Sequence, residues 1–231
     1  MKFLIILAIL PSIIIGYLIY KADKVEREPK KELFKAIILG VISVLITLFL
    51  SWITGILDID TNKLIGIEML LYSFICIAFI EELSKWICTK LLITHNKNYD
   101  YLFDGIVYAV YVSLGFATVE NLLYTVPGGV LTGIIRALVT VPSHAFYAIF
   151  MGYYISKSKD SSKKSDKLRY TLASIIIPTI LHGIFDSLLL LQNVLLLLLF
   201  IVFVIFLYII SIQKVKLLSI NERTFDNKDK L

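Results

Sequence analysis

Long apolar runs alternate with short polar connections along the whole 231-residue chain. Seven runs can be separated, at about 3–20, 36–57, 66–93, 105–125, 129–156, 170–191 and 193–213. A helix needs about 20 apolar residues to cross the ~30 Å hydrocarbon core of a bilayer, and these runs reach or approach that length. The pattern predicts an all-α fold, a polytopic transmembrane helical bundle with about seven spans.

The composition agrees with a membrane protein. Hydrophobic residues make up 58% of the chain, charged residues 18%, and the mean hydropathy is +0.84. Soluble domains average roughly 25% charged residues and have too little interior to bury so much apolar surface. The first run is interpreted as a retained span, because it is long for a signal peptide and no cleavage site follows it. The lipid bilayer is therefore the expected surrounding, and no feature indicates a nucleic-acid partner.

Basic residues are concentrated in alternate connections. Segments 21–35 and 157–169 each contain six Lys or Arg residues, and the tail after Gln213 contains five. The opposite connections, 58–63, 127–129 and 192–193, contain one basic residue between them. By the positive-inside rule, the basic side is cytoplasmic. We therefore expect a multi-pass protein with its N-terminus outside, its C-terminus in the cytoplasm and very short external turns.

Few polar residues interrupt the predicted spans. They are Glu68, Glu81, Glu82, Lys85, Glu120, Asn121, Arg136, His144, His182 and Asp186. A charged residue in the middle of a membrane helix costs roughly 2.5–3.5 kcal/mol on insertion scales, so such residues usually face a protein interior or a water-filled cavity. They are the candidate functional residues of this chain.

The spacing of these residues groups some of them. In "AFIEELSKW", Glu81 and Glu82 precede Lys85 by four and three positions, so the three share one broad helix face. In "HGIFD", His182 and Asp186 are four positions apart, which lets the carboxylate orient the imidazole or add a ligand.

Structural roles are the alternative for several of these residues. Glu82 and Lys85 could form only an intrahelical ion pair, and Arg136 could be the structural partner of a carboxylate. Glu68 lies near the predicted outer boundary, as an interfacial residue would. A lone His144 would be a hydrogen-bonded core histidine, but the other acidic residues and histidine within the spans favour a functional role. Cys76 and Cys88 would lie roughly 18 Å apart on one helix, which excludes a disulfide.

Carboxylates and imidazoles within a bilayer fit a hydrolase. A carboxylate can take a proton from a held water, while a histidine stabilises the oxyanion or binds a metal such as zinc. The histidines, His95, His144 and His182, form no HExxH motif, and no GxSxG motif occurs. His95 falls in a predicted cytoplasmic loop. A serine nucleophile stays open, since Ser84, Ser113 and Ser143 lie in or near the spans.

Four motifs occur in an order that resembles a known family. They are "EELSK", "FATVEN", the histidine of "SHAFYAIFMGYY" and "HGIFD", over roughly residues 75–190. This order is similar to that of PrsW-type intramembrane proteases, which are related to the CAAX-protease and bacteriocin-processing superfamily. That superfamily has a double glutamate, then FxxxH, then HxxxN/D. Here Glu120 takes the place of the histidine after Phe116, as in the PrsW branch.

The resemblance implies a bacterial cytoplasmic-membrane protease. Such enzymes make the first, site-1 cut in a single-span anti-sigma factor, which releases an extracytoplasmic-function sigma factor in a stress response. It implies Glu81 and Glu82 as the water-activating or metal-associated pair. Glu120, His144, His182 and Asp186 would complete the catalytic site.

The resemblance does not decide the cofactor. The superfamily has been described both as metal-dependent and as glutamate-dependent, so a divalent metal such as zinc stays open, with Glu120, His144 and His182 as candidate ligands. One integral-membrane domain is expected over 1–231, with its catalytic core at about 66–191 and a cytoplasmic tail at 214–231. An ion- or proton-coupled transporter, or a noncatalytic immunity or sensor protein on the same scaffold, is the alternative function.

One distance tests the whole hypothesis. Counted along its span, Glu81 lies roughly 20 Å below the outer side, whereas Glu120 lies near the outer end of its own span. The two levels converge only if the segment around "LIGIEMLL" lies along the interface and the fourth span begins several residues after Gly105, or if tilt brings the helices together.

Overall fold

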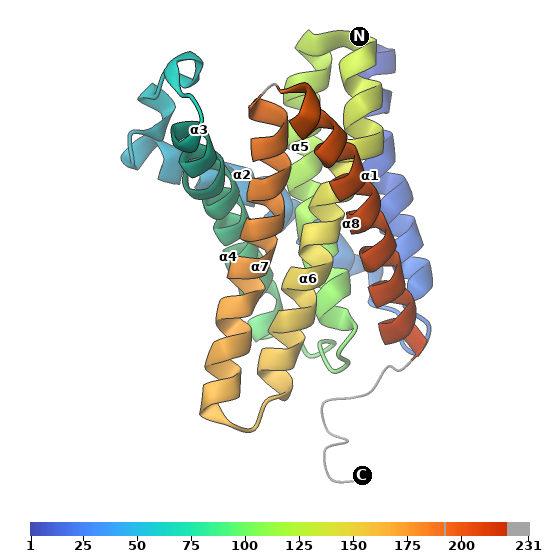
Figure 1. Ribbon diagram of the computed structural model, residues 1–231. Helices are drawn as coiled ribbons and strands as arrows, with labels where there is room; N and C mark the ends of the chain where they lie inside the picture. Colours follow the sequence, from blue (N-terminus) through green and yellow to red (C-terminus); the bar gives the residue numbers. More distant parts are fainter. Residues whose placement is uncertain (192, 221–231) are drawn as a thin grey trace.

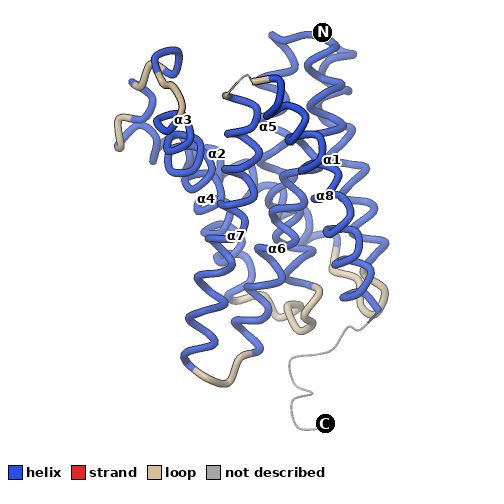
Figure 2. Tube along the Cα trace, viewed as in Figure 1, coloured by secondary structure: helices blue, strands red, loops and turns tan. Residues whose placement is uncertain are grey.

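The computed structural model describes residues 1–191 and 193–220, and the secondary-structure elements within them are all helices. The α-helices are α1 (Lys2–Ala22), α2 (Lys30–Ile53), α3 (Ile67–Leu71), α4 (Ile80–Thr94), α5 (Asp104–Ile135), α6 (Val141–Asp160), α7 (Lys164–Leu190) and α8 (Val194–Ile220). Two π-helical segments, Tyr72–Phe79 and Arg136–Thr140, lead into α4 and α6. Figure 2 shows that the loops lie at the ends of the bundle. The all-α prediction is confirmed.

Five continuous helical stretches are long and apolar enough to cross a membrane: Lys2–Ala22, Lys30–Ile53, Asp104–Asp160, Lys164–Leu190 and Val194–Ile220. The longest is not straight, because Gly129 has φ 81° and the chain turns back there (Figure 1). The predicted span at 66–93 is divided between α3, a π-helical segment and α4. The chain is thus a multi-pass membrane protein, and seven crossings stay a prediction.

Some predicted bounds shift at the ends of the bundle. The second apolar run ends as a helix at Ile53 rather than near 57, because Gly55 adopts a left-handed conformation and two short 3-10 turns follow. Residues 214–220 of the predicted tail continue α8, while 221–231 and residue 192 lie outside the described residues.

The outside of the bundle is apolar. Leu45, Leu131 and Val202 are each more than 60% exposed, and they belong to three different helices. In water such a surface would drive association, whereas hydrocarbon solvates it at no cost. The exposed faces therefore fit a lipid environment.

Helix α5 forms the centre of the bundle and packs against α1, α2, α4 and α6. Its residues from Ile106 to Val110 are at most 1% exposed. At the crossing with α2, Gly40 faces Gly115, and a Cβ on Gly40 would collide with the Val112 carbonyl. Small residues allow this backbone contact, a device that membrane helices use widely.

Candidate active site

Glu81 and Glu82 lie in the first turn of the regular α-helix α4, which directly follows the π-helical segment Tyr72–Phe79. A π-helical turn rotates the residues that follow it relative to those before, and such turns are frequent at functional sites. Both glutamates face the bundle interior, with side-chain exposures of 14% and 1% respectively. These two carboxylates are therefore turned away from the apolar outer surface of the bundle.

Lys85 connects α4 with α6. Its buried ammonium group donates hydrogen bonds to Glu82 Oε1 at 2.8 Å and Glu81 Oε2 at 3.2 Å, and it lies 3.1 Å from Nδ1 of His144. The same nitrogen lies 4.1 Å from the ring centroid of Phe116 on α5. An intrahelical pair was expected here, and the contact with His144 adds a connection between helices.

The contact with Lys85 defines the tautomer of His144. A lysine ammonium can only donate hydrogen bonds, so Nδ1 of His144 must accept. The ring proton is then on Nε2, which lies 2.8 Å from Oε2 of Glu120 and donates to it. His144 is neutral in this arrangement and bridges Lys85 to Glu120.

His182, on α7, forms a separate set of contacts with acidic residues. Its Nδ1 lies 3.0 Å from Glu82 Oε1, and its Nε2 lies 3.3 Å from Asp186 Oδ2 and 4.0 Å from Glu81 Oε2. Both ring nitrogens therefore face carboxylates on α4 or α7. The Tyr147 ring stacks on the imidazole with a centroid separation of 5.0 Å and an interplanar angle of 18°, which restricts its orientation.

Arg136 supports Glu120 from a third direction. One guanidinium nitrogen lies 3.0 Å from Glu120 Oε1, and Nε donates to Oδ1 of Asn121 at 3.0 Å. Asn121 in turn donates to the Ala8 carbonyl of α1 at 2.8 Å. Arg136 was expected as the partner of a carboxylate, and its bridge to Asn121 extends this support to α1.

The predicted residues border one cavity of about 220 Å³ between α4, α5, α6 and α7. Its walls include Glu81, Glu120, His144, His182 and Asp186, and Glu82 lies behind His182. The convergence that the hypothesis required is present, since Glu81, Glu120 and His144 have ligand atoms within 4.8 Å of one another. Glu68 and His95 are exposed and lie outside this cavity.

A serine nucleophile has no support in the geometry of the described residues. Ser84 donates to the Ile80 carbonyl at 2.7 Å, and Ser143 donates to the Val139 carbonyl at 2.8 Å. Ser113 donates to the main-chain carbonyl of His144 at 2.9 Å. None of these hydroxyls donates to an imidazole or carboxylate that could activate it.

Glu81, Glu120 and His144 form the candidate metal site of the described residues. Three protein ligands is the number found at catalytic zinc sites, and carboxylate and imidazole are both zinc ligands, although this set has one more carboxylate than the common site of two histidines and one glutamate. The expected candidate ligands included His182 beside Glu120 and His144, but both nitrogens of His182 face Glu82 and Asp186. Nε2 of His144 would have to lose its proton to bind a metal, which would replace its hydrogen bond to Glu120.

Lys85 and Asn121 were noted in the sequence, but their cross-helix partners were not foreseen. Asn121 follows Glu120 directly, and an amide beside an acid within an apolar run was the available sequence signal. Tyr147 had no distinguishing sequence signal among the aromatic residues of α6. Its packing on His182 depends on the relative rotation of α6 and α7.

Comparison with known proteins identifies the family. The model of the PrsW family intramembrane metalloprotease matches residues 28–211. Protease PrsW of Geobacillus kaustophilus is 34% identical over 82% of this chain and 81% of its own length. The proteins of the same name from Clostridioides difficile and Bacillus subtilis are 34% and 32% identical, over 82% and 78% of this chain and 80% of each relative.

No solved structure matches this chain. The family match covers all four motifs and every residue around the cavity. The chain belongs to the PrsW family of intramembrane metalloproteases and is a membrane-embedded peptidase.

Proposed function

We propose that this chain makes the site-1 cut in a single-span, membrane-anchored anti-sigma factor. The cut would release an extracytoplasmic-function sigma factor in a stress response. The chain would lie in a bacterial cytoplasmic membrane, with its N-terminus outside and its C-terminus in the cytoplasm. The observation that carries the proposal is the cavity of about 220 Å³ bordered by acidic and imidazole groups from four helices.

The position of this cavity supports a cut near the outer face. Its lining includes Leu189 and Leu190 at the end of α7, and Tyr124 close to the turn at 127–129. The connections at this end of the bundle have almost no basic residues, as expected for the external side. A substrate segment that leaves its membrane helix on that side would reach the cavity with little unwinding.

The acidic residues around the cavity would have different roles. Asp186 and Glu81 have side-chain exposures of 18% and 14%, so they can contact a water molecule in the cavity. Glu82 has only 1% exposure and is bonded to Lys85 and His182. Glu82 is therefore a positioning residue, which holds His182 against Asp186.

Asp186 would act as the general base. It takes one proton from a water molecule, whose oxygen bonds to the carbonyl carbon of the substrate peptide. When the carbon–nitrogen bond breaks, the proton passes from Asp186 to the leaving amine. His182 orients the carboxylate through Nε2 and is itself held by Glu82 through Nδ1.

Glu81, Glu120 and His144 would hold the metal that the family description implies. When bound, a metal ion polarises the scissile carbonyl and the attacking water. Arg136 would keep Glu120 in place, and Lys85 would keep Glu81 and Glu82 on the same side of α4.

Co-expression with candidate single-span anti-sigma factors tests this function. Cells with the wild-type chain should yield a shortened membrane fragment cut near the outer face, and Asp186→Asn should yield none. Glu68→Gln is the matched control, because Glu68 is an exposed acid away from the cavity. If Asp186→Asn cleaves like Glu68→Gln, the proposed base is wrong, and a wild-type chain that cuts no such substrate contradicts the proposed substrate.

A further inference from the structure

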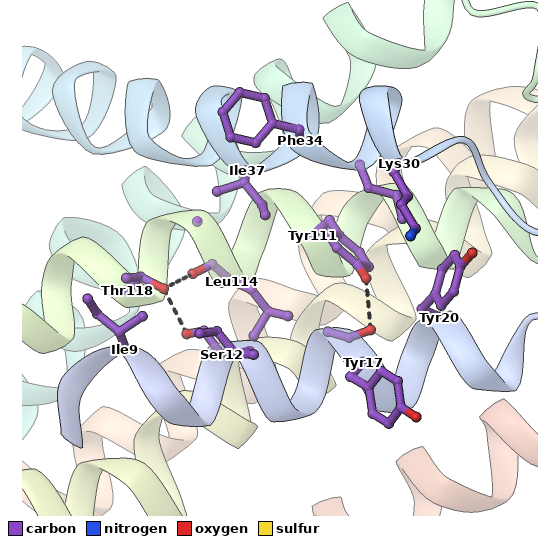
Figure 3. A pocket seen from close by; sticks show the side chains of 14 residues that line it. Ile9, Ser12, Tyr17, Tyr20, Lys30, Phe34, Ile37, Tyr111, Leu114 and Thr118 are labelled. Carbon is purple, nitrogen blue, oxygen red and sulfur yellow. Dashed lines mark hydrogen bonds between the residues drawn. The ribbon is translucent and has the colours of Figure 1, made fainter. Parts of the chain in front are cut away.

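Another cavity lies on the opposite side of α5 from the candidate active site. It is a groove of about 560 Å³ between α1, α2 and α5, shown in Figure 3. We call it the α1–α2 groove. Its walls are formed mainly by apolar side chains, including Ile9, Ile13, Phe34, Ile37 and Leu114.

The few polar groups in the membrane-embedded part of this groove are already paired. The Thr118 hydroxyl lies 2.8 Å from the Ser12 hydroxyl and donates to the Leu114 carbonyl at 2.7 Å. The Tyr111 hydroxyl donates to the Gly16 carbonyl at 2.9 Å. Figure 3 shows these bonds, of which the contacts of Thr118 with Ser12 and of Tyr111 with Gly16 join α5 to α1. The embedded part therefore has no polar group free for a polar ligand, and it favours a hydrocarbon chain.

One end of the groove is positively charged. Lys30 lies at the start of α2, and Figure 3 shows it at that end beside Tyr20 and Tyr111. It forms no ion pair or hydrogen bond within the described residues. Two acids close to it in sequence are engaged elsewhere, since Glu32 pairs with Lys35 at 2.7 Å and Glu28 is buried against Tyr108. The ammonium group of Lys30 is thus free to bind an anion.

We propose that the α1–α2 groove binds an anionic glycerophospholipid, with its phosphate at Lys30 and one acyl chain between α1 and α2. An apolar channel that ends at an unpaired lysine complements a molecule with a hydrocarbon tail and an anionic head. Tyr17 and Tyr20 line the same end, where aromatic side chains commonly meet the headgroup region. The proposal depends on the groove alone and is independent of the proposed substrate.

The variants that test the proposal follow from its two parts. Lys30→Gln removes the charge at the head end, and Lys31→Gln is its control, since Lys31 is exposed and outside the groove. Gly16→Leu fills the tail region, where a Cβ would meet Leu114 and Tyr111 at an ordinary 3.6 Å. Ile13→Phe fills the same region from an exposed position, in case Gly16→Leu does not fold.

Native mass spectrometry of the delipidated protein measures the binding. Phosphatidylglycerol should bind more tightly than phosphatidylcholine with the same acyl chains. Lys30→Gln should weaken phosphatidylglycerol binding about fivefold, the loss expected for one basic residue near an anionic headgroup, and Lys31→Gln should leave it unchanged. The groove-filling variants should weaken both lipids, and inorganic phosphate should not compete at concentrations matched to the lipid.

Three results would overturn the proposal. The first is equal binding of the two lipids, and the second is an equal effect of Lys30→Gln and Lys31→Gln. The third is a dimer that persists without lipid and dissociates in Gly16→Leu, because a second copy of the chain would then occupy the groove.

Discussion

The ammonium nitrogen of Lys85 lies 3.1 Å from Nδ1 of His144, although the two residues are 59 positions apart and belong to different helices. This contact joins the helix with the paired glutamates to the helix with the central histidine. It also requires His144 to carry its proton on Nε2, opposite Glu120. Lys85 is therefore a positioning residue for both walls of the cavity.

Replacing Lys85 should affect stability and activity together. Lys85→Met leaves Glu82 buried without its cation, and loss of one partner of a buried ion pair typically costs about 3–5 kcal/mol. We expect a lower thermal unfolding midpoint in detergent and loss of proteolysis. Lys90→Met, five residues further along α4 and half-buried, should have little effect on either measurement.

A double variant separates the two effects of Lys85. Glu82→Gln together with Lys85→Met removes the uncompensated charge, so the unfolding midpoint should recover part of the loss while activity stays absent. Recovery of proteolysis in the double variant would show that Lys85 does not position His144.

Arg136→Lys should slow catalysis without unfolding the protein. The guanidinium group contacts Glu120 and Asn121 at once, which a lysine ammonium cannot reproduce with the same geometry. Residues that orient ligands typically change activity or metal affinity by about 10- to 100-fold, so we expect kcat to fall within this range with KM little changed. Arg169→Lys, a matched change near Tyr170 at the other end of the bundle, is the control. Equal kinetics in the two variants would remove Arg136 from the site.

Zinc binding can be measured without any substrate. The purified, chelator-treated chain should take up zinc, and Glu120→Gln and His144→Gln should each lower its affinity, as read by competition with a fluorescent chelator. His95→Gln is the control, because His95 is an exposed histidine outside the cavity. The ligand assignment is wrong if zinc binds as tightly to His144→Gln as to His95→Gln.

The loop between α1 and α2 should make stability depend on pH. Burial raises the pKa of Glu28 to about 7, and the hydrogen bond from Tyr108 only partly opposes this effect. The folded state thus holds a proton that the unfolded chain releases above its ordinary pKa of about 4.5. This stabilising contribution is complete below about pH 4.5 and is lost as the pH rises through about 7.

Glu28→Gln should therefore make the fall of the unfolding midpoint between pH 5 and pH 8 shallower, with its largest gain over wild type at pH 8. Glu26→Gln changes an exposed acid two residues away and should keep the wild-type profile. A steep fall that persists in Glu28→Gln would assign the pH dependence to other groups.

The apolar runs and the intramembrane polar residues could be predicted from sequence. Apolar length determines where helices can cross lipid, and the penalty for burying charge singles out residues such as Glu81 and His182. Contacts within one helix were also accessible, since the spacing of His182 and Asp186 places them on one face, and they lie 3.3 Å apart.

Contacts between helices could not be predicted from sequence. The link from Lys85 to His144 and the chain from Arg136 through Asn121 to α1 depend on helix rotation and tilt. Two π-helical segments, 72–79 and 136–140, lie next to the site and change the rotation of α4 and α6 relative to a regular helix. No simple residue pattern predicts such segments, so the grouping of Glu81 with Glu120 and His144 as candidate ligands could be recognised only in the structure.

The most direct test of the central claim is cleavage by the purified chain in liposomes that contain a single-span anti-sigma factor. The wild-type chain should produce one fragment cut near the outer face. Glu81→Gln should produce none, although it folds and inserts like Glu68→Gln, which should cleave normally. Cleavage by Glu81→Gln at the rate of Glu68→Gln would contradict the account, because Glu81 would then contribute nothing to the cavity where the reaction is placed.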